Sequence, residues 1–258
     1  GWTLENRWRD WLSWRELLVE AAAGGGEAPA VVVFPETMFP GLVLQADGAA
    51  LERERGVQWV FPPEAGLGRG VPAGAVREDL LEVQASLGVA VLIGAARYEN
   101  FRILEEEGRF RYKEDGYFNS AFVIENGRVG EATYDKQHLT PFGEVMPYIS
   151  AWPALERALL DIGARGMRFG VERGSTRRVF GFDGLRCVVP ICFEATIPLV
   201  CRLLVFEEGE RGADLLVNIT NDGWFYDAAG GRETHLLAAR WRCVELGTPV
   251  VRAANTGI

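Results

Sequence analysis

Residues 186–194, RCVVPICFE, place a cysteine directly after a short apolar run, and this pattern decides how the chain is interpreted. Arg186 to Ile191 predicts a strand, because a brief run rich in β-branched residues suits a buried position in a sheet. Cys192 follows that strand and precedes a predicted helix at Ile197 to Glu208. Backbone N–H groups at the start of a helix favour a thiolate and a developing oxyanion, so this turn suits a nucleophile. The alternative is core packing, the commoner fate of a lone cysteine.

Alternation of strand and helix extends in both directions from this segment. Apolar runs predict further strands at Ala30–Phe34, Val89–Ala95, Phe118–Ile124, Val129–Tyr134, Asp214–Ile219 and Pro249–Ala254. Apolar spacing predicts helices at Trp2–Ala23, Val76–Leu87 and Thr234–Leu246. Asn126-Gly127 between two strand-like runs predicts a hairpin. Strands alternating with helices, plus one hairpin, predict a mixed α/β sandwich.

One long stretch, Gly41 to Gly74, has no sustained period and many glycines and prolines, which predicts a mobile loop. The apolar residues in and beside it exceed what a solvated loop needs; they are Phe39, Leu42, Val43, Leu44, Trp59, Val60 and Phe61. Two interpretations stay open: a lid that meets acyl chains or a membrane surface, or a segment packed over the sheet.

Composition bounds the class of protein. The 258 residues are 48% hydrophobic, enough for a large core, and we expect a single domain over residues 1–258. The chain begins at Gly1 rather than Met and stops soon after a predicted strand, so we expect this domain to be truncated at both ends. A net charge of -9 argues against broad electrostatic binding of nucleic acid or anionic lipid. Because the sequence has no apolar run long enough to cross a bilayer, the chain as written is expected to be soluble.

The cysteines and histidines give no indication of a metal centre. The four cysteines form no CxxC pair, and neither of the two histidines lies at zinc-finger spacing from them. We therefore expect neither a metal nor a cofactor, and interpret His138 and His235 as structural polar residues.

Two charged residues follow other predicted strands, as Cys192 follows its own. Glu36 comes directly after Val31–Pro35, where partial desolvation would raise the pKa of a carboxyl and make it a usable base, although a helix-capping acid is as common there. Lys136 ends the second hairpin strand, where an ordinary exposed lysine is the usual case. Taken together, a base, a cation and a thiol at three strand ends are what acyl transfer requires.

Three segments in this order resemble the three motif blocks of the nitrilase, or carbon-nitrogen hydrolase, superfamily: Val33–Thr37 (VFPET), Tyr134–Leu139 (YDKQHL) and Pro190–Glu194 (PICFE). The resemblance implies an α/β fold of the nitrilase type, an α-β-β-α four-layer sandwich with mixed sheets. It also implies a Glu-Lys-Cys triad in which Glu36 is the base, Lys136 stabilises the oxyanion and Cys192 is the nucleophile.

Further segments resemble the apolipoprotein N-acyltransferase family more than amidases or nitrilases: Pro141–Glu144 with Pro147, Asn218–Phe225 and Arg252–Gly257. By this likeness Glu144 orients the lysine or the attacking group, while Glu194 and Asn119 line or support the pocket. Phe193 departs from the tyrosine that this family often has after the nucleophile, so no hydroxyl acts there. Trp224 either touches substrate or fills the core.

The activity that this resemblance implies is a two-step transfer. A phospholipid gives its acyl group to Cys192 as a thioester, and the N-terminal amine of an apolipoprotein then takes it. The Lys136 ammonium and the Phe193 N–H would hold the oxyanion. The family's membrane region, which this chain lacks, would place the enzyme in the bacterial inner membrane with its catalytic part on the periplasmic or outer face. Two other functions stay open: a soluble nitrilase-type amidase that hydrolyses a small amide, and a non-catalytic module.

Overall fold

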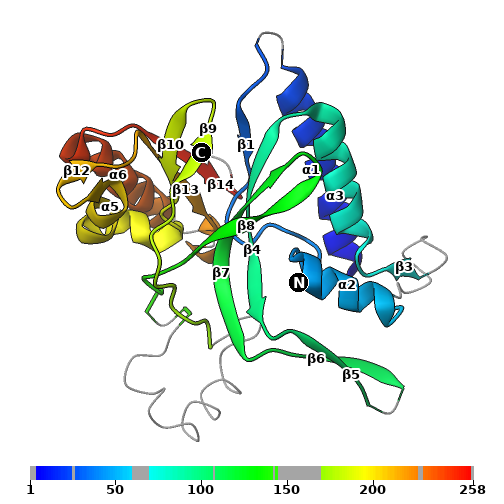
Figure 1. Cartoon of the computed structure of the whole chain (residues 1–258). Coiled ribbons are helices and arrows are strands. Elements are labelled where there is room, and N and C mark those ends of the chain that lie inside the picture. Colours follow the sequence, from blue (N-terminus) through cyan, green and yellow to red (C-terminus); the bar gives the residue numbers. More distant parts are fainter. Residues whose placement is uncertain are drawn as a thin grey trace, which may run out of the picture.

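Two four-stranded sheets form the centre of the molecule (Figure 1). The computed structural model describes residues 4–24, 27–59, 70–106, 108–141, 143–144, 170–225 and 229–256. The first sheet has the order β1 (Val31–Val33), β4 (Ala90–Glu99), β7 (Gly116–Glu125) and β8 (Arg128–Asp135). The second has the order β14 (Val250–Ala254), β13 (Leu215–Thr220), β10 (Leu185–Val188) and β9 (Phe180–Phe182).

Both sheets are mixed. In the first, β1 pairs with β4 in parallel, whereas β4–β7 and β7–β8 are antiparallel. In the second, β10, β13 and β14 are parallel and β9 is antiparallel to β10. It follows that β1 and β8 run in the same direction, so the residues that come after them emerge at the same end of the first sheet.

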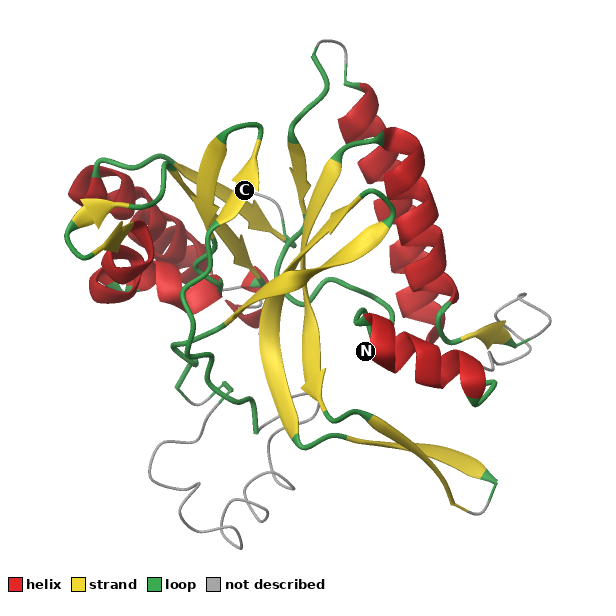
Figure 2. Cartoon of the chain, in the orientation of Figure 1, coloured by secondary structure: helices red, strands yellow, loops and turns green. Residues whose placement is uncertain are grey.

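Helices cover the outer face of each sheet (Figure 2). On β4, Val91 and Ile93 pack in one cluster with Leu80 of α3 (Ala75–Leu87) and Trp11 of α1 (Leu4–Ala23). Leu92, which points the other way, packs instead against strands of the second sheet. The helices α5 (Pro198–Val205) and α6 (Ala229–Leu246) lie beyond that second sheet. The expected α-β-β-α order is therefore confirmed.

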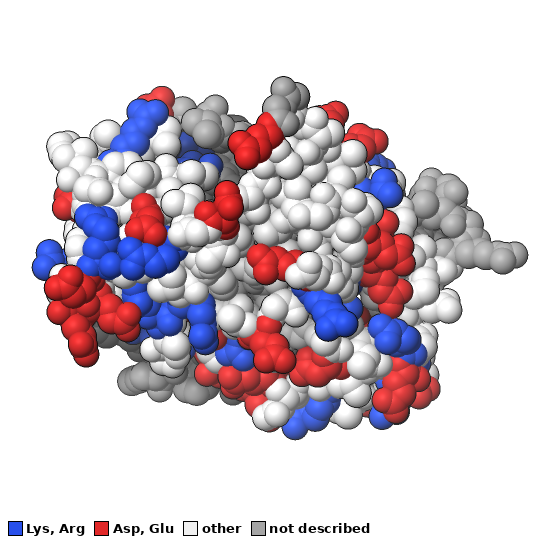
Figure 3. Space-filling view, turned by 45° about the horizontal axis from the view of Figure 1, so that its top comes forward, with Lys and Arg blue, Asp and Glu red and all other residues white. Residues whose placement is uncertain are grey.

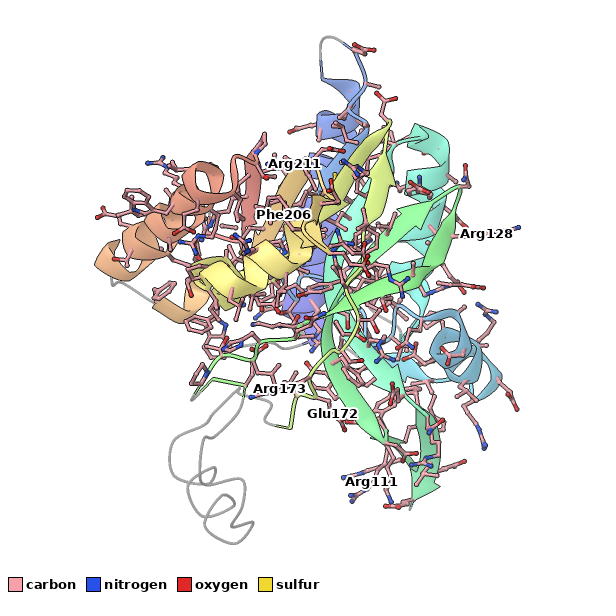
Figure 4. All side chains as sticks on the ribbon, turned by 60° about the vertical axis from the view of Figure 1, so that its left-hand side comes forward. Arg111, Arg128, Glu172, Arg173, Phe206 and Arg211 are labelled. Carbon is pink, nitrogen blue, oxygen red and sulfur yellow. The ribbon has the colours of Figure 1, made fainter. Side chains whose placement is uncertain are left out.

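The predicted strands and helices are all present, with shifted ends. The Asn126-Gly127 hairpin is confirmed, and both turn residues have positive φ, 52° and 68°, as a tight turn of the primed type requires. The helix predicted to reach Glu208 is wrong in its last residues, because α5 stops at Val205 and a small hairpin of β11 (Phe206–Glu207) and β12 (Glu210–Arg211) follows. Figure 4 shows Arg211 beside Phe206, whose ring centroid lies 5.2 Å from the Arg211 guanidinium carbon.

The prediction of one long loop from Gly41 to Gly74 is wrong. This stretch contains α2 (Ala46–Glu54) and a hairpin of β2 (Gln58–Trp59) and β3 (Val71–Pro72). Phe39, Val43, Leu44 and Trp59 belong to the core cluster under α1 and α3, so packing accounts for their apolar character, while Val60 and Phe61 lie outside the described residues. A further hairpin that was not predicted, β5 (Arg102–Glu106) and β6 (Arg109–Lys113), extends from the ends of β4 and β7 (Figure 1).

The surface carries charges of both signs. Acidic and basic side chains are interspersed on the face in Figure 3, around a broad area without charge. Among the helices that the structure describes, none combines the length and the apolar character needed to cross a bilayer.

Candidate functional site

Cys192 lies in a sharp turn after β10. The residue before it, Ile191, still bridges Ile219 of β13 in parallel, so sheet pairing continues almost to the cysteine. Cys192 has a φ of 50° and begins a short 3-10 helix, η2 (Cys192–Thr196), before α5. Side chains other than glycine rarely adopt this left-handed conformation, and residues held in it cluster at functional sites. The predicted strand, turn and helix are all present around the cysteine.

Glu36 follows β1 and is almost fully buried between the two sheets. Its Oε1 accepts a hydrogen bond of 2.7 Å from the side-chain amide of Asn119 on β7. Its Oε2 accepts one of 2.9 Å from the backbone N–H of Asn221, just after β13. Because one partner comes from each sheet, the carboxylate is fixed at the junction of the two.

Lys136 follows β8, and only 1% of its surface is exposed. Its Nζ lies 2.7 Å from Oε2 of Glu144 and 3.3 Å from Oε1 of Glu36, and it donates a third hydrogen bond of 3.3 Å to Thr140 Oγ1. Burial alone would lower the pKa of Lys136, but the negative charge of Glu36, that of Cys192 when it is a thiolate, and that of Glu144 together outweigh burial and raise the pKa. The surroundings of the lysine therefore favour its charged form.

Glu144 and Asn119 complete the surroundings of this cation. Burial alone would raise the pKa of Glu144, but Lys136 and the hydrogen bonds from Thr140 N and Asn119 lower it, so the group is ionised. Asn119 Nδ2 donates to Oε1 of Glu144 at 2.8 Å as well as to Glu36. One amide and one ammonium thus hold the two carboxylates in fixed positions.

The Cys192 thiol lies close to the charges of Glu36 and Lys136. Burial, followed by the negative charge of Glu36, raises the pKa of Cys192 to about 12, while Lys136 and a hydrogen bond with Thr220 act in the opposite direction. The free site therefore holds a neutral thiol at pH 7, and the cysteine needs a base to become nucleophilic. Glu36 is hydrogen-bonded to this thiol, which places a proton acceptor at the required position.

Glu194 does not line the cavity and instead supports the site through hydrogen bonds to nearby backbone groups. Its Oε1 accepts hydrogen bonds from the backbone N–H groups of Gln137 (2.8 Å) and His138 (2.9 Å). Its Oε2 accepts one from Ile191 N (2.8 Å), and the Tyr134 hydroxyl lies 3.0 Å from both oxygens. This buried carboxylate thus ties the segment after Lys136 to the turn that carries Cys192.

Cys192, Glu36 and Lys136 meet in one cavity of about 980 Å³. Of the supporting residues expected from the sequence, Asn119, Glu144, Phe193 and Trp224 also line it. Trp224 is 45% exposed and therefore does not fill the core. Other lining residues are largely apolar or small: Tyr117, Pro141, Val171, Thr196, Phe225, Gly230, Gly231 and Ala238. A cleft of this size with a few converging polar groups is suited to a small-molecule substrate.

Sequence reasoning missed three contributions to the site. Thr140 and the backbone N–H of Asn221 contact Lys136 and Glu36, and both are too ordinary in type to stand out in a sequence. His235 of α6 lines the cavity and contacts the backbone carbonyl of Cys192. The sequence predicts that His235 lies on a helix. It does not predict which part of the sheet that helix packs against, so the contact with Cys192 could not be foreseen.

Known proteins match the chain over nearly its whole length. The family model for carbon-nitrogen hydrolases matches residues 2–258. The apolipoprotein N-acyltransferase of Rhizobium meliloti (strain 1021) is 34% identical over 242 residues, which cover 91% of this chain and 36% of that protein. The apolipoprotein N-acyltransferase of Brucella suis biovar 1 (strain 1330) is 33% identical over 247 residues, which cover 94% of this chain and 37% of that protein. The chain thus spans little more than a third of the length of these relatives.

Solved structures show the same fold at lower identity. An amidase from Nesterenkonia sp. matches with a TM-score of 0.55 and 16% identity, over 96% of this chain and 70% of that one. A second match is a mutant of the amidase from Nesterenkonia sp. AN1 that carries a Michael adduct of acrylamide at its active-site cysteine. It has the same TM-score and identity, over 96% of this chain and 72% of that one. Together with the match over residues 2–258, these findings show that the chain belongs to the carbon-nitrogen hydrolase family.

Proposed function

We propose that this chain is the acyl-transfer part of an enzyme that moves a fatty acyl group from a phospholipid to the N-terminal amine of an apolipoprotein. Cys192 carries the acyl group, Glu36 moves the proton and Lys136 stabilises the oxyanion. The observation that supports this proposal best is the convergence of these three side chains on one cavity. A nucleophile, a base and a fixed cation are the parts that acyl transfer through a thioester needs.

In the first half-reaction, Glu36 takes the Cys192 proton as the sulfur attacks the ester carbonyl of the phospholipid. The new S–C bond gives a tetrahedral oxyanion. When the intermediate collapses, the C–O bond to the lysophospholipid breaks, and that leaving oxygen takes the proton back from Glu36. Because hydrogen bonds from Asn119 and Asn221 hold Glu36, it keeps its position while it accepts and then releases the proton.

Lys136 and the backbone N–H of Phe193 stabilise the oxyanion. The ammonium is held in place before substrate arrives by Glu144 at 2.7 Å, so its reorganisation cost is small when negative charge develops. Glu144 acts through Lys136 and is therefore a positioning residue. Glu194 contacts neither the Cys192 thiol nor the cavity. It is also a positioning residue, because it holds the turn at Cys192 through the backbone N–H of Ile191.

In the second half-reaction, a free α-amine attacks the thioester. Glu36 accepts the amine proton, the C–S bond breaks, and the proton passes to the departing thiolate, which restores the free site. The products are an amide on the acceptor and a neutral Cys192. No redox partner or metal enters this balance.

Two findings favour a lipid donor and a lipoprotein acceptor. The curated relatives at 33 to 34% identity are named apolipoprotein N-acyltransferase. The cavity also has apolar walls beside its polar end, formed by Val171, Phe193, Trp224 and Phe225, which suit an acyl chain. We further propose that a region outside this chain holds the whole protein in the bacterial inner membrane, with this part on its outer face.

Release of the acyl group distinguishes this proposal from an amidase, which would pass it to water. The purified chain is incubated in detergent micelles with a phospholipid labelled in its acyl chain, together with a lipid-modified peptide that has a free N-terminal amine. The proposal predicts a labelled N-acyl peptide, and none with the N-acetylated peptide. Labelled free fatty acid as the only product would establish a hydrolase. Cys243→Ala is the matched control, because Cys243 takes no part in the proposed chemistry, whereas Cys192→Ala should give neither product.

A further inference from the structure

His235 contacts the backbone of the proposed nucleophile rather than its thiol. This histidine on α6 is 5% exposed, and its Nε2 lies 3.2 Å from the carbonyl oxygen of Cys192. A carbonyl oxygen only accepts hydrogen bonds, so Nε2 must carry the hydrogen. The Asn218 amide approaches the same oxygen at 3.5 Å, while its shorter hydrogen bond, 2.9 Å, goes to Pro190. His235 is therefore the closer of these two donors to this carbonyl.

A buried ion pair holds the other side of the ring. With the hydrogen on Nε2, Nδ1 of His235 accepts from Arg252 Nη2 at 3.3 Å. Oδ1 of Asp222 lies 3.1 Å from Nδ1, and Arg252 Nη2 also contacts both Asp222 oxygens at 2.8 and 2.7 Å. The side chain of Asn255 accepts the backbone N–H of Asp222 at 2.9 Å, which fixes the aspartate itself. Packing alone would not require two buried charges behind a histidine, because burying an ion pair is costly in free energy. The arrangement is suited to holding the imidazole in one orientation.

The carbonyl that His235 contacts belongs to the same peptide group as the N–H of Phe193. The peptide unit is planar and conjugated, so a hydrogen bond to its oxygen draws electrons away from the nitrogen and makes the N–H a stronger donor. The same bond also fixes the orientation of a peptide whose first residue has an unusual φ of 50°. Both effects act on the Phe193 N–H, which in the proposed function donates a hydrogen bond to the oxyanion.

We propose that His235 is a positioning residue for acyl transfer, which orients and polarises the Cys192–Phe193 peptide through its Nε2–H so that the Phe193 N–H binds the oxyanion. This inference rests on the proposed function, because it needs a tetrahedral oxyanion at Cys192. It assigns no proton transfer to the histidine. Asp222 and Arg252 act one step further away, by holding the ring.

Two substitutions of His235 distinguish the contact made by Nε2 from the contacts made by Nδ1. The amide nitrogen of His235→Gln can reach the place of Nε2 and donate to the Cys192 carbonyl. The amide of His235→Asn can reach only the place of Nδ1, so it keeps a contact with Asp222 and loses the carbonyl. The pair therefore differs in the one hydrogen bond that the inference depends on, and thermal unfolding of both variants measures any shared structural cost.

Two reactions of Cys192 provide the readout. Acylation by p-nitrophenyl butyrate passes through an oxyanion, whereas alkylation by iodoacetamide displaces iodide without forming one. His235→Asn should slow acylation by roughly tenfold or more, and alkylation by less than about twofold, because one donor to an oxyanion is weakened while the thiol is unchanged. His235→Gln should acylate within about threefold of the wild type, since the donor is restored.

Equal rates of acylation in the wild type and in His235→Asn would overturn the inference, as would a parallel fall in acylation and alkylation. If neither variant folds, nitrogen NMR of the wild type with labelled histidine decides the matter, because Nε2 of His235 must carry a proton at neutral pH and a bare Nε2 would contradict the proposal. A wild type that forms no acyl adduct on Cys192 would instead refute the proposed function itself.

Discussion

The Lys136 ammonium lies 2.7 Å from Oε2 of Glu144, closer than the 3.3 Å that separates it from Oε1 of Glu36. Glu144 therefore makes the shorter ion pair with the lysine and holds the ammonium in place, which leaves Glu36 available to exchange a proton. Glu144→Gln should slow acylation of Cys192 by at least about tenfold, because Lys136 would move toward Glu36 and away from the oxyanion. The burst of p-nitrophenol measures this rate. Glu131→Gln, on the exposed face of β8, is the control and should react as the wild type does.

Gly94 of β4 packs directly against the backbone that carries Glu36. A Cβ at this position would lie 2.7 Å from Glu36 Cα, from Pro35 O and from Thr37 N, so the backbone would have to shift. Gly94→Ala should lower the acylation rate by roughly tenfold to a hundredfold although it changes no polar group in the site, since a displacement near 1 Å is enough to disrupt such a geometry. In Gly181→Ala the added Cβ meets nothing within 4 Å, so this variant should keep full activity. Equal activity of the two variants would show that the position of Glu36 is not critical.

The Cys192 thiol should resist ionisation until high pH. Burial and then the charge of Glu36 raise the pKa of Cys192 to about 12, so its thiolate absorbance should be absent from pH 7 to pH 10. Glu36→Gln removes a negative charge and leaves Lys136 in place, so thiolate should appear at lower pH although turnover is lost. The difference in absorbance at about 240 nm between each form and its Cys192→Ala partner reports the thiolate. A wild-type transition near pH 8.5 would contradict this prediction.

Glu52 of α2 should make the protein less stable as pH rises. Its two carboxylate oxygens are buried without a hydrogen-bond partner among the described residues, and burial raises its pKa from 4.5 to about 7, which Arg77 only partly offsets. Between these values the folded state keeps a proton that the unfolded state releases, so the free energy of unfolding falls from pH 5 to pH 8. Relative to Glu52→Gln, the wild type should lose on the order of 2 kcal/mol over this range. Urea unfolding at each pH measures the difference, and parallel curves for the two proteins would contradict it.

The sequence predicts the central layers of the fold because their signals are local. The apolar runs of β1, β4, β10 and β13 and the Asn126-Gly127 turn specify strands whichever partner each one finds. The stretch from Gly41 to Gly74 was misread because its elements are short, and Phe39, Val43 and Leu44 acquire their meaning only from the core that they fill. The β5–β6 hairpin was missed for a related reason, since its strands carry many exposed charged residues and show little apolar pattern.

Positions in sequence also indicate the site, but only in part. Strand ends identify Glu36, Lys136 and Cys192, which are separated by 100 and 56 positions in the chain and meet only after the two sheets pack. Local sequence does not show that Glu194 faces away from the cavity, or that a histidine on α6 reaches the Cys192 carbonyl. Both facts depend on how distant elements are placed, which the sequence pattern leaves open.

The central claim is that Cys192, served by Glu36 and Lys136, takes up an acyl group. The most direct test is the intact mass of the chain after exposure to a phospholipid, followed by peptide mapping of the modified residue. We predict one acyl group per chain, bound to Cys192 as a thioester that hydroxylamine cleaves, and no adduct on Cys192→Ala. An unmodified wild-type chain, or an acyl group mapped to Cys187, Cys201 or Cys243 instead, would contradict the account.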